Sequence, residues 1–246
     1  DIYHFHDPEL LPYGLKLKKA GKKVIFDSHE MYTEQIREKP YLPHWFARLL
    51  SHAYGKYESH VLGRIDGLVY TCLKDGVHPF AGKCRHITTI DNTPMLWELY
   101  DRYDPAAKKE ADSVVYVGGL SYARGITHLI TAAAKADCTL YLAGMFDSEE
   151  YRHTVEALPG YSCVQYLGLL GREQVVALLQ RCCVGAATLL NIGQYNQDDN
   201  LATKVYEYMS LGIPVLLSSS AYNERVMNQY HFGLCVEPDN VDELAQ

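Results

Sequence analysis

Two charged side chains in the last quarter of the chain could bind one polar ligand together. Lys204 and Glu207 lie in the segment 204–211, which the pattern predicts as a short helix that ends at Gly212 before a strand. Because the two residues are three apart, a helix places them on one face near its first turn. A cation and an acceptor carboxylate there suit a ligand with phosphate at one end and hydroxyls at the other. A helix with a solvated Lys–Glu pair is the alternative.

A glycine-containing loop is a second candidate. Gly118 and Gly119 follow a predicted strand, and Arg124 stands just before a predicted helix. Glycines at such a turn let backbone N–H groups approach an anion, and the helix dipole favours negative charge there. The loop is neither a G-x-G-x-x-G fingerprint nor a Walker A loop. A plain strand-to-helix turn is therefore the alternative.

A third group of polar residues lies near the start of the chain. His6 and Asp7 end one predicted strand, and His29 and Glu30 follow the next one. A His with a flanking Glu at a strand end can hold a hydroxyl group and stabilise developing positive charge. A structural role for the His is the alternative.

The elements that must position these residues alternate in two blocks. The first block is predicted to have strands at 2–6, 23–26, 68–71 and 86–90, helices at 8–20 and 45–62, and a loop at 27–32. The second is predicted to have strands at 114–117, 139–143, 163–166, 184–188 and 213–217, and helices at 126–136, 148–158, 172–181 and 204–211. Such alternation implies parallel sheets covered on both faces, with ligands beyond the carboxyl ends of the strands. We therefore expect a domain at 1–94, a linker at 95–111 and a second domain at 112–246.

Composition narrows the function classes. The formal net charge of −7 over 246 residues argues against nonspecific nucleic-acid binding. No apolar run reaches the roughly 18 residues that a membrane span needs. The seven cysteines are scattered and the eleven histidines show neither H-x-x-x-H nor H-E-x-x-H spacing, so we expect no metal site. A basic patch at 16–23 could face anionic lipid, with a solvated helix end as the alternative.

The segment 204–215 resembles the E-A-M-A-x-G-x-P-V region of the family 4 retaining glycosyltransferases, in its K-[LV]-[FY]-E-Y-M variant. The loop 117–125 is similar to that family's G-R-L-x-x-x-K-G, in which Arg and Lys grip the diphosphate of a nucleotide sugar. Arg124 falls on the Lys position and Gly119 on the Arg position, so half of the grip is missing unless Lys204 supplies it. In the family's E-x7-E pair, the first Glu contacts hydroxyls of the donor sugar and the second hydrogen-bonds the ribose. These positions would be Asp199 and Glu207.

Two more segments resemble the same family. Residues 164–173 are similar to V-x-F-x-G-x-V-x-x-E-E-L, which implies that Tyr166 and Leu167 border the nucleobase, although both could be core residues. The D-x-H-E segment at 27–30 looks like the family's N-terminal domain. There His29 would line the donor-sugar site, and the acceptor side would include His6, Asp7 and Glu30. Asp199 lies in the polar loop 196–200, which could equally be a surface turn.

The resemblance implies an α/β protein of GT-B type, with two Rossmann-like doubly wound domains facing across a cleft. It also implies that the first domain is incomplete and that about 60–100 residues precede it, because the chain opens on a strand. The implied enzyme is a retaining hexosyltransferase of polysaccharide or glycoconjugate biosynthesis. It would use a UDP- or GDP-sugar, with UDP favoured, and a carbohydrate or lipid-linked acceptor.

The resemblance assigns roles to residues and partners as well. Catalysis would involve His29, Asp199 and Glu207, and the donor would be held by Gly118, Gly119, Arg124, Tyr166, Leu167 and Lys204. No cofactor and no metal ion is expected. The expected location is cytoplasmic, with peripheral association at the inner face of a membrane. A nucleotide-sugar epimerase on the same fold, or a non-catalytic nucleotide- or sugar-binding module, is the alternative.

Overall fold

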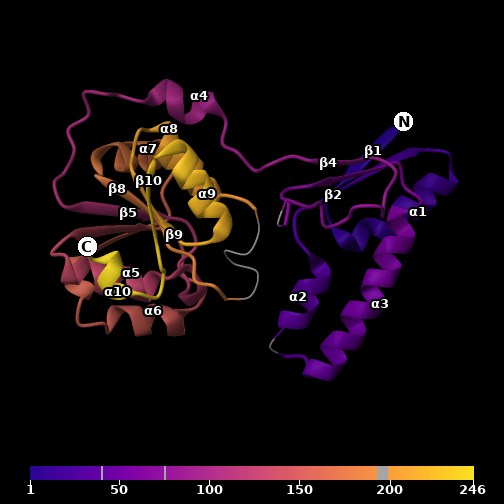
Figure 1. Ribbon diagram of the computed structural model, residues 1–246, viewed down its shortest axis with the longest axis horizontal. Helices are drawn as coiled ribbons and strands as arrows, with labels where there is room; N and C mark the ends of the chain where they lie inside the picture. Colours follow the sequence, from indigo (N-terminus) through magenta and orange to yellow (C-terminus); the bar gives the residue numbers. More distant parts are fainter. Residues whose placement is uncertain (40, 75, 193–198) are drawn as a thin grey trace. The chain divides into compact units, whose positions relative to one another are not determined.

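The structure is a computed structural model that describes residues 1–39, 41–74, 76–192 and 199–246. Contacts between the described residues divide them into two units. The first unit holds Asp1–Asn92 together with Asp199 and Asn200, and the second begins at Thr93 and holds the rest. Figure 1 colours both units along the sequence.

The first unit is a parallel sheet with the strand order β1-β2-β3-β4. Its strands are β1 (Ile2–Phe5), β2 (Lys23–Ser28), β3 (Gly67–Tyr70) and β4 (Ile87–Thr89), and its helices are α1 (Leu11–Lys19), α2 (Tyr32–Glu38) and α3 (His44–Leu62). Val24 and Phe26 of β2 and Leu68 of β3 point to one face of the sheet, because alternate strand residues share a face. They pack there with Leu11 of α1 and Leu62 of α3, so these two helices cover that face.

Two features of the first unit differ from the sequence prediction. Asp27 lies in β2 rather than in a loop, because β2 stays paired with β3 through Asp27 and Ser28. The helix α2 falls in a segment that carries little apolar periodicity, and it is held against α3, where Ser51 donates a hydrogen bond to the carbonyl of Thr33. No described helix is both long enough and apolar enough to cross a membrane.

The second unit is a parallel sheet with the strand order β10-β9-β8-β5-β6-β7. Its strands are β5 (Ser113–Val117), β6 (Thr139–Ala143), β7 (Val164–Gly168), β8 (Val184–Ala187), β9 (Val215–Ser218) and β10 (Gly233–Val236). Its helices are α4 (Leu96–Leu99), α5 (Ile126–Lys135), α6 (Glu149–Glu156), α7 (Arg172–Arg181), α8 (Thr203–Ser210), α9 (Ala221–Tyr230) and α10 (Val241–Leu244). The order reverses at β5, which has β6 on one side and β8 on the other, and such a switch point is where open parallel sheets bind ligands.

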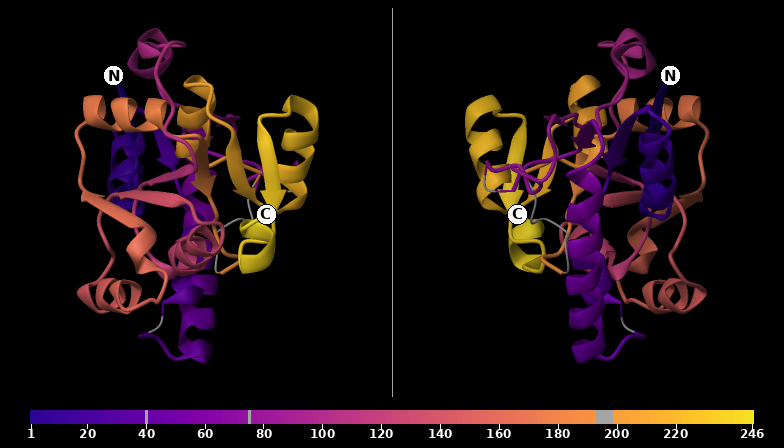
Figure 2. Two further views of the ribbon diagram at one scale, coloured as in Figure 1. Left: turned by 90° about the vertical axis from the view of Figure 1, so that its left-hand side faces the viewer. Right: turned by 90° about the vertical axis from the view of Figure 1, so that its right-hand side faces the viewer.

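Helices cover both faces of this second sheet, as Figures 1 and 2 show. Val115 of β5 packs with α7 and α8 on one face, whereas Tyr116 packs with α5 on the other. This alternation explains why β5 is an almost continuous apolar run. The predicted strand at 139–143 and helix at 172–181 match β6 and α7, while α9 and β10 were not predicted.

Candidate functional site

A cavity of about 290 Å³ lies at the carboxyl ends of β5 and β6 and beside the start of α7. Its lining residues are mostly small or apolar: Val117, Gly118, Gly119, Ala143, Gly144, Met145, Leu169, Leu170 and Val175. The cavity therefore lies at the carboxyl end of β5, beside the switch point where a ligand is expected.

Close contact between two backbone segments forms the floor of this cavity. Gly144 has φ +147°, and a Cβ added to it would lie 1.8 Å from the carbonyl oxygen of Gly118. The amide of Gly118 also donates to the carbonyl of Ala143 at 2.9 Å. Only glycine fits at residue 144, so the chain keeps this approach at the cost of any side chain there.

The helix α8 is fixed against the sheet by Tyr208. The Tyr208 ring is fully buried, and a Cβ added to Gly185 would lie 2.5 Å from it. The Tyr208 hydroxyl accepts a hydrogen bond from the amide of Val117 at 3.3 Å and donates toward the carbonyl of Ala186 at 3.3 Å. This anchor explains the second Tyr of the K-V-Y-E-Y-M segment. It sets the rotation of α8 that turns Lys204 and Glu207 inward.

Lys204 is 7% exposed, and its Nζ has no hydrogen-bond partner among the described residues. The ammonium lies 3.5 Å from the centre of the Tyr116 ring and 3.0 Å from the point that a Cβ of Gly118 would occupy. Burial, together with the positive charge of Arg124, holds the pKa of Lys204 well below its usual range. The alternative of a solvated Lys is therefore wrong, and a buried cation next to the cavity calls for an anion.

Arg124 approaches the same backbone position as Lys204. Its Nη1 lies 3.9 Å from the point that a Cβ of Gly118 would occupy, and its Nε lies 3.5 Å from the corresponding point at Gly119. Arg124 ends a short 3-10 turn, and Gly125, at φ +70°, leads directly into α5. Two cations and a helix N-terminus therefore converge beside the glycines, which is an arrangement suited to a diphosphate.

Glu207 belongs to a partly buried ion-pair network that includes a residue the sequence did not single out. Nη1 of Arg172 lies 2.7 Å from Oε1 of Glu207, whose side chain is 12% exposed. Nη2 of the same guanidinium lies 3.3 Å from Oε2 of Glu98 in α4. Arg172 thus fixes the orientation of the Glu207 carboxylate, and one residue of α4 helps to hold that guanidinium in place.

The two residues predicted to border the base do not line the cavity. The hydroxyl of Tyr166 donates to the carbonyl of Gly144 at 3.1 Å, and the ring packs against Phe146, so Tyr166 supports the glycine floor from the core side. Leu167 is 38% exposed on the other face of the strand. The lining is made instead by Leu169 and Leu170, a few residues later in the same segment.

The predicted residues of the first unit gather at the ends of β1 and β2. His6 and His29 are exposed and lie 3.2 Å apart, measured from Nδ1 to Nε2. Glu30 is exposed next to His29, and its carbonyl accepts a hydrogen bond from the buried Ser28 hydroxyl. Asp7 precedes the 3-10 turn Pro8–Leu10 without capping it through its side chain.

Asp199 belongs to the first unit by its contacts. It forms an isolated bridge with Leu73, and its carboxylate accepts a hydrogen bond from the amide of Gly76 at 2.5 Å. Residues 196–198 of the predicted polar loop lie outside the described part of the chain. The carboxylate therefore helps to close a turn in the first unit, and its role toward a donor stays a prediction.

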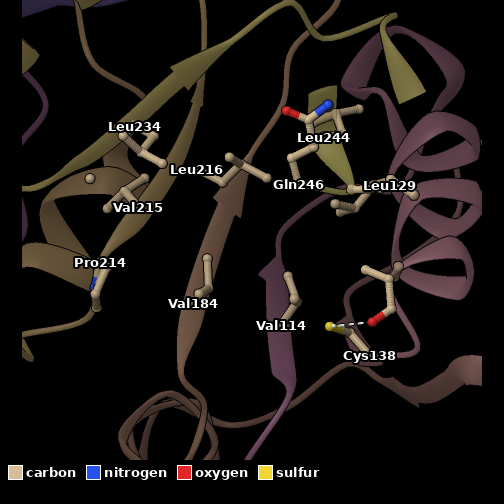
Figure 3. Close-up of a pocket in the computed structure, with 15 residues that line it drawn as sticks. Val114, Leu129, Cys138, Val184, Pro214, Val215, Leu216, Leu234, Leu244 and Gln246 are labelled. Atoms are coloured by element: carbon tan, nitrogen blue, oxygen red, sulfur yellow. Dashed lines mark hydrogen bonds between the residues drawn. The ribbon is translucent and has the colours of Figure 1, made fainter. Parts of the chain in front are cut away.

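A second cavity of the second unit is less suited to chemistry. It measures about 410 Å³ and is lined by apolar side chains, among them Val114, Leu129, Val184 and Leu216 (Figure 3). These residues lie at the amino ends of the strands, the opposite end from Lys204, and no charged side chain lines the cavity. We therefore take the glycine-lined cavity as the candidate functional site.

Sequence reasoning missed Arg172, Glu98 and the buried Thr188, whose hydroxyl has no hydrogen-bond partner among the described residues and lies against Gly125. Arg172 is 35 residues from Glu207 and so gives no periodic signal. The available clue for Thr188 was its place directly after an apolar strand, where side chains reach the ligand edge of a parallel sheet.

Comparison with known proteins relates this site to one family. The family model described as "Glycosyl transferases group 1" matches residues 101–246. No curated protein sequence matches the chain.

Several solved structures have a similar fold. The chain is similar to sucrose-phosphate synthase from Thermosynechococcus elongatus, with a TM-score of 0.71 and 18% identity over 99% of this chain and 62% of that one. HepE from Anabaena in complex with UDP gives a TM-score of 0.68 and 15% identity over 100% of this chain and 67% of that one. WaaG, a glycosyltransferase involved in lipopolysaccharide biosynthesis, gives a TM-score of 0.63 and 14% identity over 94% of this chain and 69% of that one. The chain thus spans less than two thirds of the length of the synthase chain. The similarity of these structures confirms the predicted α/β fold of GT-B type.

Proposed function

Because the chain belongs to the group 1 glycosyl transferases, we propose that it moves a hexose from a nucleotide-diphosphate sugar to an acceptor, with retention at the anomeric carbon. The family supports glycosyl transfer itself. The motifs of the second unit, which resemble those of family 4 retaining enzymes, support the finer assignment. The proposed acceptor is a carbohydrate or a lipid-linked sugar of polysaccharide or glycoconjugate biosynthesis.

The buried ammonium of Lys204 is the observation that carries this proposal. It has no hydrogen-bond partner among the described residues, and it lies with Arg124 beside the glycines that precede α5. A diphosphate at this place would receive both cations and the N-terminal amides of the helix. Lys204 thereby takes the part of the Arg that Gly119 replaces in the resembling loop.

The mechanism that follows rests on stabilising the leaving group. As the bond between the anomeric carbon and the diphosphate oxygen breaks, negative charge builds up on the diphosphate, where Lys204 and Arg124 stabilise it. The acceptor hydroxyl attacks from the same side and passes its proton to a leaving-group oxygen. This scheme needs no protein nucleophile. It also needs no divalent ion at the diphosphate, because fixed cations take that part.

The remaining site residues would recognise the two ends of the donor and the acceptor. Glu207, oriented by Arg172, would accept hydrogen bonds from the ribose hydroxyls. Asp199 and His29 would contact the donor sugar, and the acceptor side would include His6, Asp7 and Glu30. UDP is the favoured nucleotide, and the UDP bound to the similar HepE structure supports this choice.

We propose a cytoplasmic location with peripheral association at the inner face of a membrane.

A screen of nucleotide sugars followed by product analysis tests the proposal. The thermal unfolding of the chain is measured with UDP-, GDP-, dTDP- and ADP-sugars. A ligand at 100 times its dissociation constant adds about 2.7 kcal/mol of stability. The stabilising donor is then incubated with candidate acceptors, and the anomeric configuration of the product is determined by NMR. We expect a UDP-sugar to stabilise the chain and the product to keep the donor's configuration.

Other outcomes identify other functions. An inverted product would overturn the retaining mechanism. Conversion of the UDP-sugar in the absence of an acceptor would show an epimerase, and UDP binding without any turnover of donor would show a binding module.

A further inference from the structure

The first unit places several imidazoles on one face of its sheet. Alternation along β1 turns Phe5 toward the core and leaves His4 and His6 on the opposite face. In β2, Phe26 points to the core in the same way and Asp27 does not. The parallel register pairs His4 with Ile25, so His6 and Asp27 both lie just beyond the last registered pair. The strands β1 and β2 thus bring His4, His6 and Asp27 together, and His29 lies close by because it directly follows the end of β2.

The donor atoms of these residues are close to one another. Oδ2 of Asp27 lies 3.2 Å from Nδ1 of His6 and 3.5 Å from Nε2 of His4. Ligand atoms of all three residues lie within 4.8 Å of each other. A tetrahedral centre with bonds of roughly 2.0–2.2 Å to nitrogen and oxygen separates its ligands by roughly 3.3–3.5 Å. The measured distances to the Asp27 carboxylate therefore fit one shared ion.

Hydrogen bonds alone leave part of this arrangement unexplained. Nδ1 of His6 lies 3.2 Å from Oδ2 of Asp27 and also 3.2 Å from Nε2 of His29. A ring nitrogen of neutral imidazole has one proton or one lone pair in its plane, so it serves one strong partner at a time. A cation among these atoms uses the lone pairs of the imidazoles and the charge of Asp27 together.

We propose that His4, His6 and Asp27 form a binding site for a divalent first-row transition metal ion, with Zn²⁺ as the best match. Imidazole nitrogens with one carboxylate oxygen select such ions over Mg²⁺ and Ca²⁺, which prefer oxygen ligands. The two imidazoles are about half exposed, at 46% and 55%, so water can complete the coordination. Linear spacing did not show this site because Asp27 comes from the neighbouring strand.

The site shares His6 with the proposed acceptor side, but its test does not depend on the proposed glycosyl transfer. Its ligands lie in the first unit, whereas the diphosphate would be held by Lys204 and Arg124 of the second. The test measures metal binding and not turnover, so failure of the metal proposal and failure of the proposed glycosyl transfer are distinguishable.

Titration of the chelator-treated chain with ZnCl2 by calorimetry tests the proposal. We expect one Zn²⁺ per chain with a dissociation constant below about 1 μM, and a rise in thermal stability with Zn²⁺. Co²⁺ should give the visible absorption bands of a four- or five-coordinate ion. His4→Gln, His6→Gln and Asp27→Asn should each weaken Zn²⁺ binding by about tenfold or more.

A matched control separates this site from adventitious binding to surface histidines. His52→Gln removes an exposed imidazole from α3 of the same unit and should leave the affinity unchanged. Absence of saturable binding, or equal binding by the wild type and the His4→Gln variant, would overturn the proposal. Should Asp27→Asn fail to fold, His4→Gln at its exposed position still decides.

Discussion

At the scale of single residues, Lys204 is the side chain on which the proposed diphosphate site depends most. Its ammonium is buried beside Gly118 without a hydrogen-bond partner among the described residues, while Glu207 on the next turn of the helix is already paired with Arg172. Under the proposed function, the two charges therefore act on different parts of the donor: Lys204 would bind the phosphate and Glu207 would bind hydroxyl groups.

Substitution of the two residues should separate these roles. Lys204→Met keeps most of the length of the side chain and removes its charge, so UDP binding should weaken roughly 10- to 100-fold while uridine binding stays nearly unchanged. Glu207→Gln should weaken the binding of both ligands by similar factors, because both contain the ribose. Calorimetric titration measures the affinities.

Lys135→Met is the matched control for this pair, because Lys135 is exposed at the end of α5 and pairs with Asp242. It should change neither affinity. Equal losses of UDP and uridine binding in Lys204→Met would show that Lys204 supports the pocket without touching the diphosphate.

At the scale of the elements, the glycines at the strand ends determine whether the cavity forms. The end of β6 and the loop after β5 touch through Gly144 and the carbonyl of Gly118, and a methyl group at residue 144 would have no room. Gly119, which directly follows Gly118, would meet only ordinary contacts with an added side chain, since a Cβ there would lie 3.5 Å from Nε of Arg124. Gly144 and Gly119 thus differ in whether the backbone around them leaves room for a side chain.

Gly144→Ala should therefore destabilise the second unit by about 1–3 kcal/mol or more, because both the positive φ and the backbone contact oppose a side chain. Gly119→Ala should stay within about 0.5 kcal/mol of the wild type. Urea unfolding measures both changes. A Gly144→Ala protein as stable as the wild type would contradict the close approach of the two segments.

Most elements could be predicted because their apolar periodicity is strong, as in β6 and α7. The helix α9 could not, since only Asn223 and Met227 among its ten residues are buried and its apolar stripe is weak. The Ser220 side chain that accepts from the amide of Asn223 was the available signal. The edge strand β10 has four residues, and its Leu234 is 69% exposed, so its pattern resembles a loop.

The site was predictable only where one short segment carries it. Lys204, Glu207 and the glycine loop could be found from the sequence because a helix turn and a strand-to-helix turn set their positions locally. The pairing of Arg172 with Glu207 and the cluster of His4 with Asp27 depend on contacts across 35 and 23 positions. No spacing rule reports such contacts, because packing of the sheet creates them.

At the scale of the whole molecule, each unit has its own sheet and its own core, and the proposed chemistry draws on both. The family match covers residues 101–246 and therefore most of the second unit. Since the chain spans 62% of the similar synthase chain, its substrates remain those of the proposal above. For the chain as a whole, the stability of the ligand-free fold and the binding of an anionic ligand place opposite demands on the buried Lys204.

The buried Lys204 implies a trade-off between stability and activity. In the ligand-free protein the lowered pKa of this ammonium opposes folding, because the unfolded chain holds the proton more tightly than the folded one. That penalty is full below the folded pKa and fades as the pH rises toward the ordinary value of 10.5. Lys204→Met should thus raise the melting temperature of the ligand-free chain at pH 7, with an advantage that shrinks under alkaline conditions, while the addition of UDP should reverse the ranking. Under the proposed function, the chain thus accepts a less stable ligand-free state in return for a cation that binds the donor diphosphate.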